Sequence, residues 1–259
     1  MPTPSVMSTT ASSVLPTQSF KHLLPHICVI IPVRNEEESI SSVVSSLKKL
    51  GLKTIRVVDN GSDDRSAFRA KAAGAEVLPE PKPGYGQACW TGLQNLPKAT
   101  EWILFCDGDG SDDPDDILNF LEAILEEHPT PEFIVGDRRA TATGKAALTP
   151  IQNFGNALAS TLIHWGWGFR YHDLGPLRLI RRSALEAMQM QDRGFGWTVE
   201  MQIRAVELGL HIRELPVNYR PRQGGQSKIS GTLLGSVKAG TIILKTVVQR
   251  YSKTLVKQI

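Results

Sequence analysis

The sequence predicts an α/β protein built on a mostly parallel β-sheet flanked by helices. Three observations support this fold class. Short apolar runs alternate with segments whose apolar residues recur at helical spacing, as in repeated strand–helix units. The runs are apolar throughout, which is typical of strands buried on both faces. Polar turns directly follow three of the runs, at residues 34–36, 59–64 and 107–113.

The bulk composition is that of a folded globular protein. The chain has 259 residues, of which 41% are hydrophobic and 21% charged, enough for one large domain or two small ones. Its first 20 residues are rich in Ser, Thr and Pro, so we expect a disordered tail over residues 1–25. No apolar stretch reaches the roughly 18–20 residues of a spanning helix, and we expect a cytoplasmic protein. We expect buried free thiols at Cys28, Cys89 and Cys106.

The first half of the chain divides into regular strand–helix units. The expected strands cover residues 27–33, 54–58, 75–78, 102–106 and 132–136. The expected helices cover residues 40–50, about 86–96 and 114–127, and Gly51 ends the first of them. Because the carboxyl ends of parallel strands lie along one edge of a sheet, we expect the three polar turns to form one site.

The second half is less regular. We expect a helix near residues 150–163, a short strand at 177–181, a helix after Trp197 and a strand over 212–219. The loop 220–228, RPRQGGQSK, combines Arg, Lys and a Gly pair. Charge-assisted hydrogen bonds and open backbone N–H groups would let it hold a pyrophosphate. For Arg220 alone, a solvated basic loop is the favoured interpretation.

The acidic turn after the fourth strand is the strongest candidate site. Asp107 and Asp109 are separated only by Gly108, so their carboxylates can turn towards one hard cation. Oxygen ligands of this kind suit Mg²⁺ or Mn²⁺, which commonly bridges carboxylates to substrate phosphates. The next acids, Asp112 to Asp115, are expected to start a helix, with Ser111 or Asp112 as its cap and Pro114 opening it.

Charge is distributed unevenly along the chain. From residue 211 to the end there are nine Lys or Arg and one acid, Glu214, which indicates an anionic partner for this part. The first strand lacks the Gly-rich turn that cradles dinucleotides, and this argues against a nicotinamide or flavin enzyme. We expect no nucleic-acid partner.

A series of motifs then resembles a known family. In order, these are VIIPVRNEEESI, VVDNGSDD, FCDGDGSDDP, GDRR, HDLGPLR, GFGWTVEMQIRA and RPRQGGQSK. Together they resemble the family 2 glycosyltransferases with the GT-A fold, and most of all the dolichyl-phosphate mannose and polyprenyl-phosphate sugar synthases. The resemblance implies a Rossmann-like GT-A domain over residues 26–230. It also implies a metal-dependent, inverting transfer of a hexose from its GDP or UDP derivative to a polyprenyl (dolichyl-type) phosphate.

The resemblance also implies roles for individual residues. Donor binding falls to Pro32, Arg34, Asn35, Glu36, Asp59, Gly86, Asp107, Gly108 and Asp109. Asp107 and Asp109 would hold the metal. Acceptor phosphate or donor diphosphate would be bound by Arg138, Arg178, Arg222, Ser227 and Lys228, and Asp109, Glu200 and Arg222 would be catalytic.

Three positions depart from the family pattern. Asn60 follows Asp59 where two Asp are usual, which affects the expected base contacts. Ser111 stands where the polyprenyl-phosphate enzymes often have Gln, which affects a third metal ligand. The HDLGPLR motif is one residue shorter than the usual version, so the sugar and acceptor can differ from mannose and dolichol.

The acceptor decides whether a general base is needed. A lipid phosphate is already ionised at neutral pH, whereas a soluble hydroxyl acceptor requires a carboxylate to take its proton. Glu200 is the candidate base, and a structural anchor for a neighbouring Arg is an equally good interpretation of it. Two other classes remain: a sugar-nucleotide nucleotidyltransferase, which normally has a Gly-rich loop after the first strand, and a non-catalytic nucleotide-sugar-binding subunit.

Residues 231–259 are expected to form a basic amphipathic C-terminal helix. Its apolar residues lie on one stripe, with Lys238, Lys245 and Arg250 off it. Such a helix can lie on an anionic membrane surface, pack on its own domain or bind a membrane-embedded partner subunit. The hypothesis at this point is a peripheral protein at the cytoplasmic face of the membrane.

Overall fold

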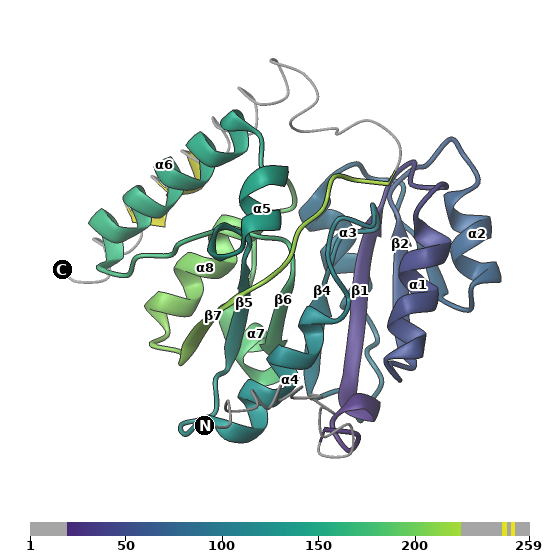
Figure 1. The fold of residues 1–259 in the computed structure, drawn as a ribbon, viewed down its shortest axis with the longest axis horizontal. Coiled ribbons are helices and arrows are strands. Elements are labelled where there is room, and N and C mark those ends of the chain that lie inside the picture. Colours follow the sequence, from purple (N-terminus) through teal and green to yellow (C-terminus); the bar gives the residue numbers. More distant parts are fainter. Residues whose placement is uncertain (1–19, 224–244, 248–249, 252–259) are drawn as a thin grey trace, which may run out of the picture.

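The computed structural model describes residues 20–223, 245–247 and 250–251. At its centre is a seven-stranded sheet with the order β3-β2-β1-β4-β6-β5-β7 (Figure 1). The strands are β1 (Ile27–Val33), β2 (Thr54–Asp59), β3 (Glu76–Pro79), β4 (Trp102–Phe105), β5 (Phe133–Asp137), β6 (Arg178–Arg181) and β7 (Ile212–Pro216). All neighbouring pairs are parallel except the two that involve β6, which runs antiparallel to β4 and β5.

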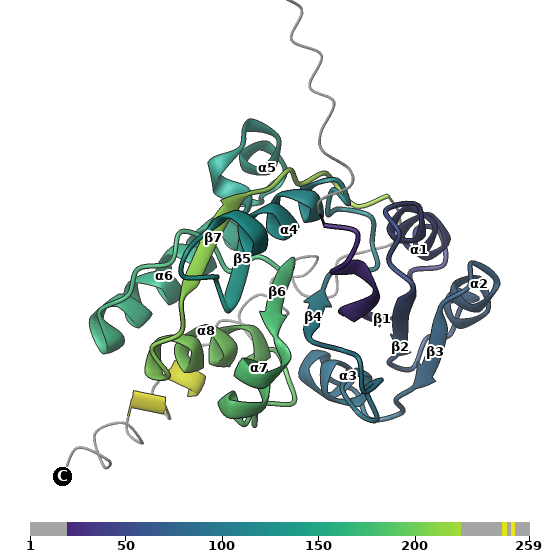
Figure 2. The same ribbon diagram turned by 90° about the horizontal axis from the view of Figure 1, so that it is seen from below.

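Helices cover both faces of this sheet (Figure 2). One face packs against α1 (Ile40–Lys49), α2 (Ser66–Ala72) and α4 (Asp116–Glu126). The other packs against α3 (Tyr85–Gly92), α6 (Pro150–Trp167), α7 (Arg182–Met188) and α8 (Trp197–Glu207). Shorter elements are the 3-10 helices η1 (Leu24–His26) and η2 (Arg138–Ala140) and the helix α5 (Ala142–Ala147).

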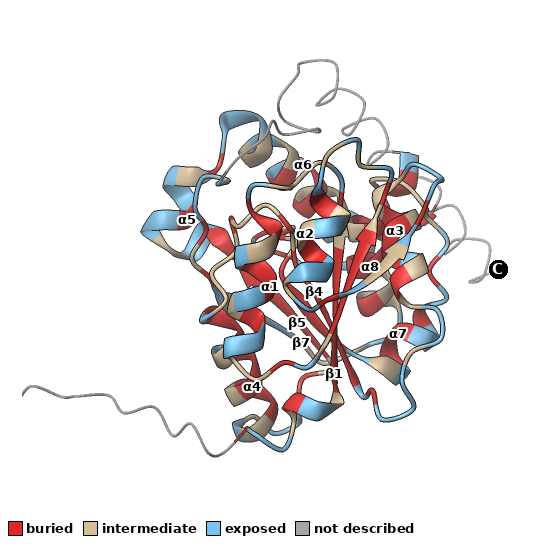
Figure 3. Ribbon diagram, turned by 90° about the vertical axis from the view of Figure 1, so that its right-hand side faces the viewer, coloured by how far each residue is buried: buried red, intermediate tan, exposed pale blue. Residues whose placement is uncertain are grey.

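The continuous apolar runs are explained by these two cores. In β1, Val29 and Ile31 face the core under α1 and α4, whereas Cys28 and Ile30 face the opposite core. Successive side chains of a strand point to opposite faces, so a strand covered on both sides needs apolar residues at every position. The buried strands between exposed helix surfaces are visible in Figure 3. The predicted α/β class is confirmed.

Several element boundaries differ from the expectations. The helices α2 and η1 were not expected, α3 ends at Gly92, and α6 continues to Trp167. The cap expected at Ser111 or Asp112 is wrong, because α4 begins at Asp116 and its N-cap, Asp115, makes no side-chain cap.

The two ends of the described chain pack on the domain. Phe20 is buried, so ordered structure begins inside the tail expected over residues 1–25. Near the other end, Val247 is buried in the core beside α8, and Tyr251 packs edge-on against Trp167 at 6.0 Å. These described residues of the C-terminal segment therefore contact their own domain.

Two further expectations can be compared with the structure. The three cysteines are buried free thiols, as predicted. Among the helices of the described residues, none has the length and apolar character needed to cross a membrane.

Candidate active site

The polar turns after β1 and β2 are joined into one rigid surface at the carboxyl edge of the sheet. The N–H of Asn35 donates to the Ser62 hydroxyl at 3.0 Å, and the Asn35 side-chain oxygen accepts from the N–H of Asp63 at 2.8 Å. Asn35 adopts a φ of 55°, a left-handed conformation that Asn tolerates better than most residues. The Glu36 N–H donates to Ser66 at 2.7 Å.

The acidic turn after β4 brings three carboxylates together. Asp109 accepts a hydrogen bond from the N–H of Ser111 at 2.9 Å, and Asp112 accepts one from the N–H of Asp107 at 3.0 Å. Burial, and then the neighbouring Asp109 and Asp112, raise the pKa of Asp107 well above its usual range. Burial also raises the pKa of Asp112 to about 7. The turn thus concentrates negative charge in a poorly solvated place.

The segment that follows β7 lies against this acidic turn. We call residues 219–223 the strap. Its backbone pairs with the turn, with the Gln223 N–H donating to the Asp109 carbonyl at 3.1 Å and the Arg220 N–H to the Ser111 carbonyl at 2.9 Å. Tyr219 forms an isolated bridge with Asp112. The last strand of the sheet therefore delivers the strap to the end of β4.

Arg222 is the cation that the strap brings to the site. Its guanidinium lies 2.7 Å from the Glu36 carboxylate and 3.4 Å from that of Asp109. Its Nε is buried and has no hydrogen-bond partner within the described part of the chain. Arg222 is thus placed between the first and third polar turns and retains a donor for a further anionic group.

The donor set at Asp107 and Asp109 fits a hard divalent cation. A cation would stabilise the charged form of Asp107, which burial and then the neighbouring Asp109 and Asp112 disfavour by raising its pKa. Within the described ranges, no group of three or more His, Cys, Asp or Glu is arranged to enclose a metal. A cation on Asp107 and Asp109 would therefore complete its shell with water and ligand oxygens, as Mg²⁺ does beside phosphates.

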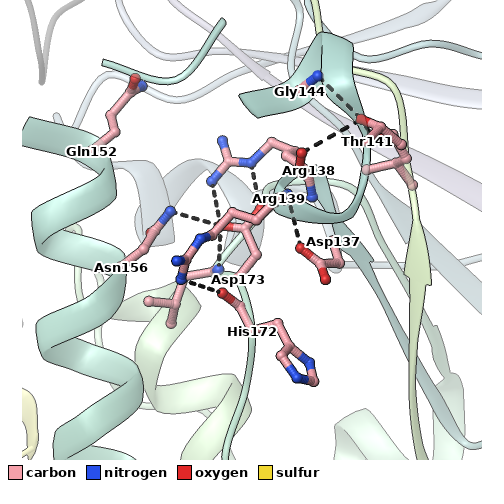
Figure 4. Close-up of polar contacts among 12 residues, drawn as sticks. Asp137, Arg138, Arg139, Thr141, Gly144, Gln152, Asn156, His172 and Asp173 are labelled. Carbon is pink, nitrogen blue, oxygen red and sulfur yellow. Dashed lines mark hydrogen bonds and ion pairs between the residues drawn. The ribbon is translucent and has the colours of Figure 1, made fainter. Parts of the chain in front are cut away.

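A buried ion pair organises the neighbouring turn after β5 (Figure 4). Arg138 donates to both carboxylate oxygens of Asp173, at 2.7 and 2.9 Å, and Asn156 of α6 donates to the same carboxylate at 2.7 Å. Arg138 also lies over the Tyr219 ring at 4.9 Å. Asp173 and the Tyr219 ring of the strap therefore share the charge of Arg138. Arg138 holds the turn after β5 against the strap and does not present a free cation to a ligand.

Arg178 does not join the site as the resemblance implied. It is 1% exposed and donates to the carbonyls of Gly175, Thr198 and Leu174 at 2.8, 2.8 and 3.3 Å. Burial lowers its pKa to about 10. Its guanidinium fixes the turn that enters β6, and we do not carry it forward as a phosphate ligand.

Glu200 likewise acts as an anchor in the structure. It is 2% exposed, and one of its oxygens accepts from the N–H groups of Gln191 and Asp192 at 2.9 and 2.6 Å. Its other oxygen pairs with Arg250 of the C-terminal segment. A carboxylate engaged in this way is not placed to take a proton from an acceptor, so the assignment of Glu200 as catalytic base is withdrawn.

Two residues near the expected nucleobase contacts, Asn60 and Gly86, shape the backbone around them. Asn60 accepts from the N–H of Gly84 at 2.8 Å and donates to the carbonyls of Glu80 and Lys82 at 2.9 and 2.7 Å. It therefore shapes the 80–84 loop in place of a second Asp. Gly86 approaches the chain so closely that a Cβ there would lie 2.7 Å from the Asp192 carbonyl oxygen.

The other residues expected to bind the donor lie in or directly after β1, β2 and β4. Asp59 is half-buried at the end of β2, Pro32 is half-buried in β1, and Arg34 is exposed. Gly108 is packed against β1, because a Cβ there would lie 2.8 Å from Val33. Ser227 and Lys228 of the loop 220–228 lie outside the described residues.

The sequence reasoning missed three residues of this arrangement. They are Asp112, which was assigned to a helix start, Asp173, and Tyr219. Asp173 carried a usable signal, since residues 138–172 contain no Asp or Glu and the first acid after them is Asp173. An isolated acid after two consecutive arginines is a reasonable candidate for a buried ion pair.

Comparison with known proteins decides the family. A model described as glycosyl transferase family 2 matches residues 28–188. The chain belongs to this family. The matched region holds the first three polar turns and the Arg138–Asp173 pair, while the strap lies beyond it.

Several named relatives match more than four fifths of the chain. An uncharacterised glycosyltransferase of Mycobacterium tuberculosis is 35% identical over 214 residues, covering 82% of this chain and 94% of that protein. Undecaprenyl-phosphate mannosyltransferase of Micrococcus luteus is 30% identical over 81% of this chain and 89% of its own length. Dolichyl-phosphate hexose transferase of Haloferax volcanii is 27% identical over 85% and 92%.

A solved structure shows the same fold. Glucosyl-3-phosphoglycerate synthase from M. tuberculosis, in complex with Mn²⁺, UDP and glucosyl-3-phosphoglycerate, superposes with a TM-score of 0.75. The match covers 92% of this chain and 85% of that one at 20% identity. The sheet and its flanking helices are therefore a GT-A-like arrangement.

Proposed function

We propose that this family 2 glycosyltransferase transfers a hexose from a GDP- or UDP-sugar to a polyprenyl phosphate, with inversion at the anomeric carbon. The single observation that carries the proposal is the position of Arg222. It brings a cation from the end of the chain to the acidic turn at Asp109. A cation beside an acidic turn suits a donor diphosphate bound through a divalent cation.

The proposed metal is Mg²⁺ or Mn²⁺ on Asp107 and Asp109. When bound, it would supply charge stabilisation for the leaving nucleoside diphosphate. The chain's own part is to fix the donor: the turns at Asn35 and Asp59 border the space for base and ribose, and Arg222 neutralises negative charge that develops during departure. The solved structure with the same fold was determined with Mn²⁺ and UDP bound, which supports the choice of these ligands.

An acceptor that is already ionised agrees with the contacts of Glu200. Among the described residues, the proposed base Glu200 is buried and bonded to two backbone N–H groups and Arg250. A phosphate oxygen needs no base, whereas a hydroxyl does. The relatives named for undecaprenyl and dolichyl phosphate support a lipid carrier, and we propose peripheral attachment at the cytoplasmic face of the membrane.

A soluble phosphorylated acceptor is the second candidate. It is favoured by the structural neighbour that is a glucosyl-3-phosphoglycerate synthase. Both acceptors present an anionic group, so both agree with the exposed Arg139 in the turn after β5.

The test is an incubation of the purified protein with Mn²⁺ and a panel of nucleotide sugars. Nucleoside diphosphate release is measured with prenyl phosphate, with phosphoglycerate, and with neither. We expect release that depends on prenyl phosphate. Release with phosphoglycerate alone selects the soluble acceptor. Turnover of the nucleotide sugar that requires added pyrophosphate indicates a nucleotidyltransferase, and binding of nucleotide sugars without any release indicates a non-catalytic subunit.

A further inference from the structure

We infer that the outward face of α6 is the surface by which this protein binds an anionic lipid bilayer. The inference deepens the proposed function and rests on it, since a polyprenyl-phosphate acceptor is held in a bilayer. The α6 face is defined here by Ile151, Phe154, Leu158, Leu162 and Trp165, of which Leu162 is partly buried and also packs against the core.

The α6 face is an aligned apolar stripe on a helix without Asp, Glu, Lys or Arg. Its members follow the spacing i, i+3, i+7, i+11 and i+14, which places them on one side of a helix. Phe154 is 70% exposed and Trp165 is 76% exposed. The opposite side, which includes Asn156 and Ile163, is buried against the domain.

This exposure is concentrated rather than scattered. Seven large hydrophobic residues are exposed among the described residues, and three of them, Ile151, Phe154 and Trp165, lie on α6. Single exposed apolar residues are normal on a protein surface, but a contiguous patch indicates an interaction site. The helix lies on the outer flank of the molecule, next to α5 (Figure 1).

The charge around the α6 face selects an anionic occupant. Residues 138–172, which include η2, α5 and α6, contain four Lys or Arg and no Asp or Glu. Arg139, Lys145 and Arg170 of this stretch are exposed. Exposed aromatic side chains on a helix, with exposed cations in the segments that adjoin it, suit the boundary between lipid headgroups and acyl chains.

The basic residues near the C-terminus are used differently. Arg213 pairs with Glu127, Arg220 with Asp113, and Arg250 with Glu200. Internal carboxylates thus neutralise several of the cations that gave the sequence its basic C-terminal part. The cations of residues 138–172, by contrast, have no Asp or Glu within their own stretch of sequence.

A second copy of the chain is a poorer occupant of this face. A two-fold interface brings the same patch of both copies together. The exposed cations Arg139, Lys145 and Arg170 of the two copies would then come together, and the repulsion between like charges would oppose the contact. A bilayer with anionic headgroups has the opposite, favourable charge.

The α6 face is also connected to the active site. Asn156 on the buried side of α6 donates to Asp173, which holds Arg138 beside Tyr219 of the strap. Figure 4 shows this path from α6 to the turn after β5. Docking through α6 would therefore bring headgroup phosphates close to Arg139 in the turn after β5.

The test is flotation of the full-length protein with vesicles of phosphatidylcholine, with and without phosphatidylglycerol. We expect binding that requires phosphatidylglycerol and weakens with added salt. Phe154→Ala together with Trp165→Ala should lower the partition coefficient by about a hundredfold, roughly tenfold for each aromatic ring. Lys145→Gln together with Arg170→Gln should lower it by roughly tenfold on anionic vesicles only.

The matched control is Phe68→Ala on α2. Phe68 is 63% exposed but lies on a different helix, so its loss should leave vesicle binding unchanged. Circular dichroism establishes that each variant is folded. Equal binding by the wild type and the double aromatic variant, or absence of binding by the wild type, overturns the inference. So does a wild-type dimer in light scattering that the double variant converts to a monomer, because a second copy then covers the face.

A soluble acceptor separates this inference from the proposed function. Transfer to a short-chain, water-soluble prenyl phosphate does not require a bilayer. If the double aromatic variant keeps this transfer and loses transfer to vesicle-held acceptor, both proposals are supported. If the wild type transfers sugar to the short-chain acceptor without binding vesicles, only the surface assignment fails; vesicle binding without any transfer removes the function instead.

Discussion

Arg222 lies across the acidic turn of the active site, 2.7 Å from the Glu36 carboxylate and 3.4 Å from that of Asp109. These three residues come from the turn after β1, the turn after β4 and the strap after β7. Their meeting means that this candidate site draws on nearly the whole chain, since each partner follows a different strand at the same edge of the sheet.

Arg222→Gln should reduce nucleoside diphosphate release by about a hundredfold, the cost typical of losing one donor to a developing negative charge. Steady-state kinetics with saturating metal measure the effect. Arg220→Gln is the matched control, because Arg220 is in the same strap but pairs with Asp113 at the surface. Comparable losses in both variants would mean that the strap acts through its general charge, not through Arg222.

Asp107→Asn should remove metal-dependent activity and yet make the metal-free protein more stable, by about 1 kcal/mol. The reason is that burial and two neighbouring carboxylates disfavour the charged form of Asp107 and raise its pKa. Thermal unfolding with and without Mn²⁺ measures both effects: the variant should unfold at a higher temperature than the wild type without metal and gain nothing from Mn²⁺. A lower unfolding temperature without metal would contradict the repulsion described for this turn.

Glu200→Gln should destabilise the fold by about 3 kcal/mol, as expected when one partner of a buried ion pair is lost. The folded fraction should retain its turnover number. Urea unfolding measures the stability, and a double-mutant cycle with Arg250→Met isolates the pair. A normally stable variant without turnover would restore Glu200 as a catalytic group.

The Asp173–Arg138 pair should make stability depend on pH in the acid range. Burial alone would raise the pKa of Asp173, but hydrogen bonds from Arg138 and its charge outweigh this, so the pKa is lowered. A carboxyl with a folded-state pKa below its unfolded value contributes stability above the unfolded value, about 3.9, and loses it as the pH falls through the folded value.

Asp173→Asn removes this contribution. The difference in unfolding free energy between wild type and variant should be constant near neutral pH and shrink below about pH 4. Urea titrations at a series of pH values measure it. A difference that persists undiminished at the lowest pH would show that Asp173 acts in its neutral form.

Much of the first half of the chain, with the turns expected to bind the donor, could be predicted because its sequence patterns are local. Apolar runs fix the strands, and parallel strands place their turns on one edge, so Asn35, Asp59 and Asp109 were expected near one another. The helix α2 was missed because Phe68, its one large apolar residue, is 63% exposed, which leaves no apolar stripe to detect. The antiparallel direction of β6 is set by pairing with β4 and β5, and local sequence carries no information on it.

The roles of buried charges could not be predicted. Arg178 and Glu200 have the residue types that phosphate binding and base catalysis require, but only the folded chain shows that backbone groups and Arg250 already use them. Asp112 satisfied the rules for a helix cap equally well, and the bridge to Tyr219 that draws it into the acidic turn joins residues far apart in sequence.

The Arg138–Asp173 pair also ties together the two ends of a long excursion. The chain leaves the sheet after β5, forms η2, α5 and α6, and returns to β6, with the pair bridging the base of this excursion. A segment closed at its base can change in length and surface without disturbing the strands around it. The surface that we propose for membrane attachment can therefore diverge between relatives, as an exchangeable segment, while the turns proposed to bind the nucleotide sugar stay as they are.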